Sequence, residues 1–101
     1  MKYFSFKETS NKGWMLCPNW DTFWSEGQSL SGSFAVLGAR VAGLSWAQWL
    51  RFCRQNGADL YGKDHKYVCA IWKEPNKEFE KLMNQRAEAL SKQINFKELS
   101  L

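Results

Sequence analysis

The sequence is poor in the residues on which most catalytic and metal sites depend. It has a single histidine and three cysteines, and no two cysteines form a C-x-x-C pair. The phosphate loop, the G-x-S-x-G elbow and the H-E-x-x-H zinc motif are all missing. We therefore expect a protein that is not an enzyme and that uses no cofactor.

Residues with metal-binding atoms do occur, but their surroundings argue against a metal site. Cys53 falls on an apolar helical stripe, Cys69 lies within an apolar strand, and His65 sits in a predicted turn. A free cysteine usually behaves as a small buried hydrophobe. These three residues are therefore predicted to be structural and not to bind a metal.

Long apolar runs are also missing. Arg40 and polar residues interrupt the longest candidate well short of a membrane-spanning length. The first residues alternate around Phe4 and Phe6, as a strand does, and do not form the apolar core of a signal peptide. An odd number of cysteines without an export signal favours reduced thiols. We expect a soluble cytoplasmic protein without a membrane partner.

Length and hydrophobic pattern predict a single α+β domain that covers residues 1–101. We expect antiparallel hairpins at about 2–17 and 59–72, packed with helices at about 45–56 and 76–95. The sequence does not indicate the order of the strands or the oligomeric state.

Three other segments have weaker signals. Residues 34–42 are predicted to form a short helix, which Gly38 weakens by about 1 kcal/mol relative to alanine. Residues 25–33, rich in serine and glycine, predict a flexible loop. Residues 96–101 are expected to fray at the end of the last helix.

The helix at 45–56 has the clearest ends. Ser45 and Gln48 stand in the S-x-x-Q arrangement, in which each side chain satisfies a free N–H group of the first turn. Gly57 follows at the position where a left-handed residue closes a helix. One apolar stripe of 3.6-residue period runs between these ends, formed by Trp46, Trp49, Leu50 and Cys53.

The second predicted hairpin contains the most apolar strand of the chain. Residues 67–72 are apolar or aromatic at consecutive positions, whereas residues 62–66 before them are turn-rich. Apolar residues on both sides of a strand are typical of a strand covered on both faces. We therefore predict that 67–72 is a central strand.

The net charge of +4 comes from one part of the chain. Basic and acidic residues cancel in 1–39 and in 74–101, so the excess lies in 40–73. A local excess of positive charge suggests a negatively charged partner, either an acidic protein surface or a nucleic acid. The alternative is a stable domain whose charges happen to fall there. The candidate binding residues are Arg40, Gln48, Arg51, Arg54, Gln55, Lys63, His65 and Lys66.

Six tryptophans in 101 residues form a second candidate set. Exposed tryptophans commonly anchor protein interfaces, and they can also stack unpaired bases. A small domain also uses such large side chains to fill its core. We expect Trp14, Trp46, Trp49 and Trp72 in the core. Trp20 and Trp24, close to the predicted loop, are the candidates for an exposed patch.

The pattern Ala39-x-x-x-Gly43-Leu44, with Trp49 and Phe52 beyond it, resembles the helix-turn-helix family. The resemblance implies a first helix at 34–42 and a recognition helix at 45–56, with Gln48, Arg51, Arg54 and Gln55 toward DNA. It also implies that Lys63, His65 and Lys66, at the tip of the second hairpin, contact the DNA backbone as the wing of such a protein does. Three positions depart from the pattern: Gly38 replaces an apolar residue, Trp49 replaces a β-branched one, and Trp46 would lie near the DNA.

Residues 50–72, LRFCRQNGADLYGKDHKYVCAIW, are similar to segments of short uncharacterised proteins from bacterial phages and integrative elements. This resemblance implies a mobile-element context, in which small proteins often inhibit host enzymes. Our leading hypothesis is therefore an inhibitor that docks a basic and aromatic surface on a nucleic-acid-handling host or defence protein. The alternative is direct binding of DNA or RNA by the same basic residues. The modest net charge favours the first hypothesis.

Overall fold

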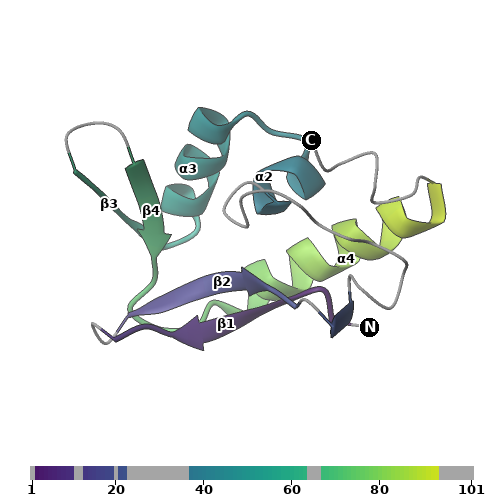
Figure 1. Ribbon diagram of the computed structural model, residues 1–101, viewed down its shortest axis with the longest axis horizontal. Helices are drawn as coiled ribbons and strands as arrows, with labels where there is room; N and C mark the ends of the chain where they lie inside the picture. The colour runs from purple at the N-terminus through teal and green to yellow at the C-terminus, as the bar shows by residue number, and fades with distance from the viewer. Residues whose placement is uncertain (1, 11–12, 20, 23–36, 64–66, 94–101) are drawn as a thin grey trace.

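A computed structural model shows a small α+β domain built from two β-hairpins and several helices (Figure 1). It describes residues 2–10, 13–19, 21–22, 37–63 and 67–93. The predicted fold class is therefore confirmed. The predicted loop at 25–33 and the predicted tail at 96–101 lie outside the described residues.

Both predicted hairpins are present. Strand β1 (Phe4–Glu8) pairs antiparallel with β2 (Trp14–Pro18), and β3 (Asp59–Lys63) pairs antiparallel with β4 (Tyr67–Ile71). In the first hairpin Gly13 is required by a close approach, since a Cβ atom at this position would collide with the Ile71 side chain. The turn of the first hairpin therefore packs directly on β4.

Among the described residues, backbone hydrogen bonds join the two hairpins at one pair of residues. The Trp14 N–H donates to the Trp72 carbonyl at 2.7 Å, and the Trp72 N–H donates to the Trp14 carbonyl at 2.8 Å. Trp72 directly follows β4, so β2 meets β4 only at its end. As a result, Cys69, Ala70 and Ile71 of β4 are only half-buried. The prediction of a central strand covered on both faces is therefore wrong for most of β4.

Helix α3 (Trp46–Gln55) confirms the prediction for residues 45–56. Ser45 and Gln48 form the predicted capping box, and Gly57 adopts a φ of 99° after the C-cap. Helix α2 (Leu37–Ala42) precedes it, and Gly43, with a φ of 72°, begins the three-residue turn between them. The left-handed turn residue directs α3 back along α2, and the two helices pack together.

Helix α4 (Lys77–Gln93) confirms the last predicted helix and lies along the first hairpin and α2 (Figure 1). Its buried residues Phe79, Met83 and Ala87 follow each other four positions apart, so they form one stripe on the inner side. The Asn76 side chain caps the helix by accepting the Phe79 N–H at 3.1 Å.

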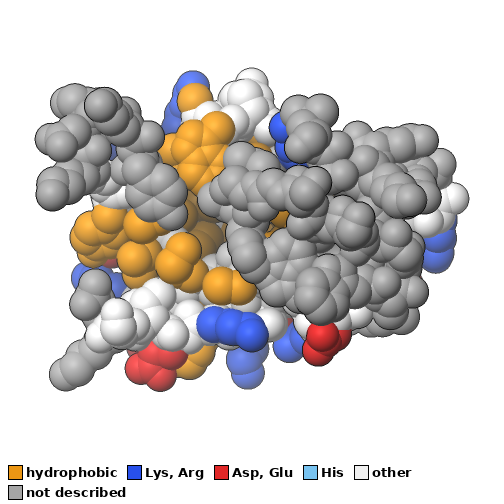
Figure 2. Space-filling model, viewed as in Figure 1, with side chains coloured by type: hydrophobic (Ala, Val, Ile, Leu, Met, Phe, Trp, Pro, Cys, Tyr) orange, Lys and Arg blue, Asp and Glu red, His pale blue; other side chains and the backbone are white. Residues whose placement is uncertain are grey.

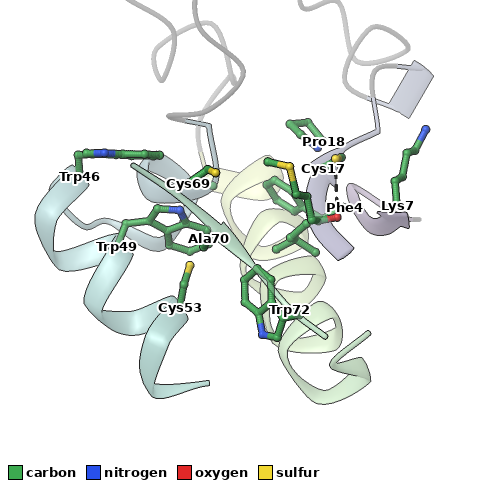
Figure 3. Close-up of a pocket in the computed structure, with 13 residues that line it drawn as sticks. Phe4, Lys7, Cys17, Pro18, Trp46, Trp49, Cys53, Cys69, Ala70 and Trp72 are labelled. Carbon is green, nitrogen blue, oxygen red and sulfur yellow. Dashed lines mark hydrogen bonds between the residues drawn. The ribbon is translucent and has the colours of Figure 1, made fainter. Parts of the chain in front are cut away.

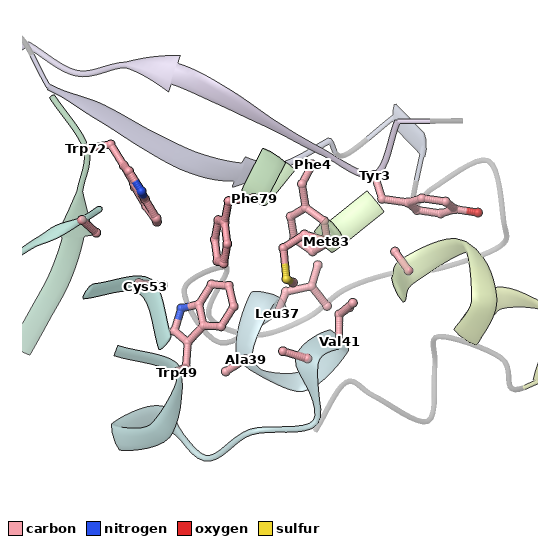
Figure 4. Close-up of a cluster of buried hydrophobic side chains, with 13 residues drawn as sticks. Tyr3, Phe4, Leu37, Ala39, Val41, Trp49, Cys53, Trp72, Phe79 and Met83 are labelled. Atoms are coloured by element: carbon pink, nitrogen blue, oxygen red, sulfur yellow. The ribbon is translucent and has the colours of Figure 1, made fainter. Parts of the chain in front are cut away.

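The core is aromatic and is centred on Phe79 (Figure 4). The Phe79 ring lies 5.8 Å from the Trp49 ring and 5.4 Å from the Trp72 ring, measured between centroids. Trp14 and Trp46 are half-buried and pack against this cluster. The prediction of four core tryptophans is therefore confirmed for Trp49 and Trp72, whereas Trp14 and Trp46 lie at the margin of the core. Each large ring removes about 150–250 Å² from water, so this cluster supplies much of the stability.

Candidate functional site

The outward side of α3 is polar and exposed. We call it the α3 outer face, and it consists of five exposed residues: Ala47, Gln48, Arg51, Arg54 and Gln55. The opposite side buries Trp49 and Cys53. This separation follows from the 3.6-residue period, because the apolar stripe must turn toward the core and leaves the remaining positions in solvent. Four of the predicted binding residues are thus brought together on one helix.

Among the described residues, no acidic side chain forms an ion pair with the arginines of this face. The sequence contains no aspartate or glutamate between residues 27 and 58, so neither α2 nor α3 carries an acid. Within the described residues, the ion pair present joins Lys2 to Glu80, and none involves Arg51 or Arg54. Both arginines are exposed on the surface of the described part of the chain.

Of the other predicted binding residues, those that the structure describes lie away from α3. Arg40 lies on α2 and is half-buried. Lys63 ends β3 in the second hairpin. The remaining candidates lie outside the described residues, namely Trp20, Trp24, His65 and Lys66. The predicted wing and the predicted aromatic patch therefore remain expectations.

Two of the departures from the helix-turn-helix pattern, Gly38 and Trp49, have a common cause, because these two residues pack against each other. A Cβ atom on Gly38 would lie 2.7 Å from Cζ2 of Trp49, so the indole occupies the space that a side chain at 38 would need. The large residue on α3 and the missing side chain on α2 thus compensate each other. The third departure is also explained, because Trp46 is half-buried and lies off the α3 outer face.

A second feature is an apolar cavity of about 380 Å³ between β2, β4 and α3 (Figure 3). We call it the β2–β4 groove. Figure 2 shows hydrophobic side chains gathered at the surface in this region, between α3 and the first hairpin. Its lining residues are Phe4, Lys7, Met15, Leu16, Cys17, Pro18, Gly38, Trp46, Trp49, Cys53, Cys69, Ala70 and Trp72. The sequence did not predict it, because these residues come from several separate elements and form no local motif.

All three cysteines are free thiols, and all three line the groove. Burial raises the pKa of the Cys53 thiol to about 12. Burial also raises the pKa of the Cys17 thiol, although the Lys7 ammonium opposes this effect. The raised pKa values keep the sulfur atoms of Cys17 and Cys53 protonated at neutral pH, and a protonated thiol is a poor nucleophile and a poor ligand. The described residues contain no group of three or more histidine, cysteine, aspartate or glutamate side chains that could hold a metal ion.

Comparisons with known proteins leave the geometry as the main guide to function. No family of known proteins matches the chain, and no curated protein or solved structure matches it either. Among the described helices, none combines the length and the apolar character that crossing a membrane requires. The chemistry of the α3 outer face and of the β2–β4 groove therefore indicates the function.

Proposed function

We propose that this protein is a non-enzymatic binding protein that contacts double-stranded nucleic acid through the α3 outer face. One observation carries the proposal: Arg51, Arg54 and Gln55 are exposed together on one helix, in a stretch of sequence without acids. Gln48 lies beside them, but its side-chain oxygen already accepts the Ser45 N–H in the capping box. An α-helix fits the major groove of DNA, where arginine can bind guanine and glutamine can bind adenine through two hydrogen bonds each. Arginines that point to the backbone would bind phosphates instead.

The arrangement around α3 supports a duplex more than a single strand. Binding of unpaired bases relies on exposed aromatic rings for stacking. Among the described residues, Tyr61 is the large hydrophobic side chain that is exposed, with 54% of its surface accessible. It lies on β3 and not on the α3 outer face. The helix therefore offers charge and amide groups, which suit a groove and its phosphates.

The dependence of affinity on salt tests the proposal. Binding of a fluorescent 20-base-pair duplex of mixed sequence would be followed by anisotropy between 50 and 200 mM salt. If about two to four phosphates are contacted, the affinity should fall roughly 10- to 200-fold over this range. The absence of binding at 50 mM salt, or an affinity that does not change with salt, would contradict the proposal.

A second candidate is an acidic protein surface, such as that of a nucleic-acid-handling host or defence protein. It is favoured by the half-buried Trp46, which adjoins the α3 outer face on the same helix and could anchor a protein interface. This function would accord with an origin in a phage or another mobile element. It predicts no duplex binding and only a shallow salt dependence with the true partner.

A further inference from the structure

The β2–β4 groove is bordered by two strand edges that separate after a single contact. Figure 1 shows the end of β4 close to the start of β2, with the two strands then running apart. The contact is the Trp14–Trp72 pair. Within the described residues, no other hydrogen bond between backbone groups joins β2 to β4.

Both edges direct backbone hydrogen-bonding groups toward this opening. Successive residues of a strand direct their N–H and C=O groups to opposite edges. Because Trp72 bonds to Trp14, the backbone groups of Ala70, two residues earlier, lie on the same edge of β4. The same alternation places the backbone groups of Leu16 on the edge of β2 that faces β4.

The lining of the groove confirms that it lies at the strand edges. Neighbouring residues of a strand point to opposite faces, so a cavity over one face would be lined by alternate residues. Instead, four consecutive residues of β2 (Met15, Leu16, Cys17 and Pro18) line the groove, and so do the consecutive Cys69 and Ala70 of β4. The apolar side chains therefore surround an opening that also presents backbone donors and acceptors.

We propose that the β2–β4 groove binds an extended segment of a partner protein, which pairs with the edge of β4 and places apolar side chains in the cavity. The better edge is that of β4, because Pro18 has no N–H group and limits pairing along β2. An added strand would use the N–H and C=O groups of Ala70, and backbone hydrogen bonds of this kind provide affinity in many peptide-binding domains.

Charge complementarity identifies the chemistry of the segment further. Lys7 is exposed and is the charged residue among those that line the groove. Its register partner across the first hairpin is Met15, which also lines the groove, so Lys7 borders the opening from the side of β1. The segment should therefore carry an acidic residue beside its apolar ones. This site is separate from the α3 outer face, so its test does not depend on the proposed function.

An apolar small molecule would fit the chemistry of the groove less well than a peptide. The volume of about 380 Å³ is within the range of small-molecule sites. Such a molecule would cover the backbone groups of Ala70 and Leu16 without replacing their hydrogen bonds to water, which is unfavourable. An extended peptide satisfies the same groups.

Selection from a library of random octapeptides displayed on phage tests the proposal on the full chain. The selected peptides should combine apolar residues at alternate positions with an acidic residue. Binding of a selected peptide should slow amide hydrogen exchange at Ala70. Methylation of the peptide nitrogen atoms that pair with β4 should reduce affinity about tenfold or more, because it removes the donors and keeps the side chains.

Two charge-reversal variants separate the groove from general electrostatics. Lys7→Glu should weaken binding of the acidic peptide about tenfold. Lys73→Glu changes a lysine that is also exposed but lies outside the groove, and it should leave binding nearly unchanged. The proposal is overturned if no peptide is enriched, if Ala70 exchange is unaffected, or if methylated peptides bind equally well. Sedimentation that shows a dimer in which peptide binding is blocked would overturn it too, since a second copy would then occupy the groove.

Discussion

At the scale of single residues, Gly38 and Trp49 show how two unusual choices can depend on each other. Each departs from the pattern expected for a helix, a turn and a second helix. In the structure the indole of Trp49 fills the space beside the glycine, so neither can be understood alone. The sequence predicted a cost at Gly38 from helix propensity, but it could not reveal the partner, because the contact forms across two helices.

We predict that Gly38→Ala lowers the free energy of unfolding by about 1–3 kcal/mol, as overpacking of a core does. The Cβ atom would press on the buried ring, and this penalty should exceed the gain of about 1 kcal/mol in helix propensity. Urea unfolding measures the change. In a Trp49→Phe background the same substitution should be neutral or stabilising, because the ring atoms in contact are gone. Equal penalties in both backgrounds would show that the two residues do not interact.

Cys53 gives a prediction about pH. Its pKa is raised from 9.0 to about 12 in the folded chain, so the folded state retains the thiol proton at pH values where the unfolded state loses it. Proton loss that favours the unfolded state lowers stability. The free energy of unfolding should therefore decrease between about pH 9 and 12, and a Cys53→Ala variant should lose that part of the decrease. Identical pH profiles for the two proteins would contradict the burial of an ionisable thiol.

At the scale of elements, the sequence correctly predicted the features that depend on residues close together in the chain, such as the ends of a helix. The capping box and Gly57 give the ends of α3, and both lie within a few residues of the helix they end. The apolar character of 67–72 was a poorer guide, because burial of a strand depends on which distant strand approaches it. Trp72, directly after β4, bonds to β2 at one position, and the half-buried Cys69 and Ala70 before it form part of the groove.

Asn84 joins helix α4 to strand β1, and no signal in the sequence predicts this contact. Its side-chain oxygen accepts the N–H groups of Tyr3 and Phe4, and its amide nitrogen donates to the carbonyls of Phe4 and Glu80 at 3.0 and 2.9 Å. A side chain of α4 thereby pairs with β1 as another strand would. The amide is satisfied on both its oxygen and its nitrogen, and this couples the last helix to the start of the chain.

We predict that Asn84→Ala lowers the free energy of unfolding by about 2–4 kcal/mol, since it removes several partly buried hydrogen bonds at once. The exposed neighbour on the same helix, in the variant Gln85→Ala, should change it by less than about 0.5 kcal/mol. Thermal and urea unfolding would compare the two variants. A similar small effect from both would mean that the contact between α4 and β1 adds little to the fold.

At the scale of the whole molecule, the two candidate binding surfaces have different origins. The α3 outer face was predictable, because its polar residues share one helix and follow from its apolar stripe. The β2–β4 groove was not, because it needs residues of the first hairpin, the second hairpin and α3 at once. The central claim concerns the first surface: the exposed arginines of α3, which form no ion pair with the described residues, hold an anionic partner and do not stabilise the fold.

Charge reversal at both arginines tests this claim most directly. We predict that Arg51→Glu combined with Arg54→Glu weakens duplex binding by roughly 100-fold at low salt, because each substitution replaces attraction to phosphate by repulsion. The free energy of unfolding should stay within about 0.5 kcal/mol of the original protein. The matched control is Lys77→Glu with Lys81→Glu on α4, which changes the net charge equally at two exposed positions and should retain most of the binding. Equal losses of binding in both double variants, or a large loss of stability in the first, would contradict the account.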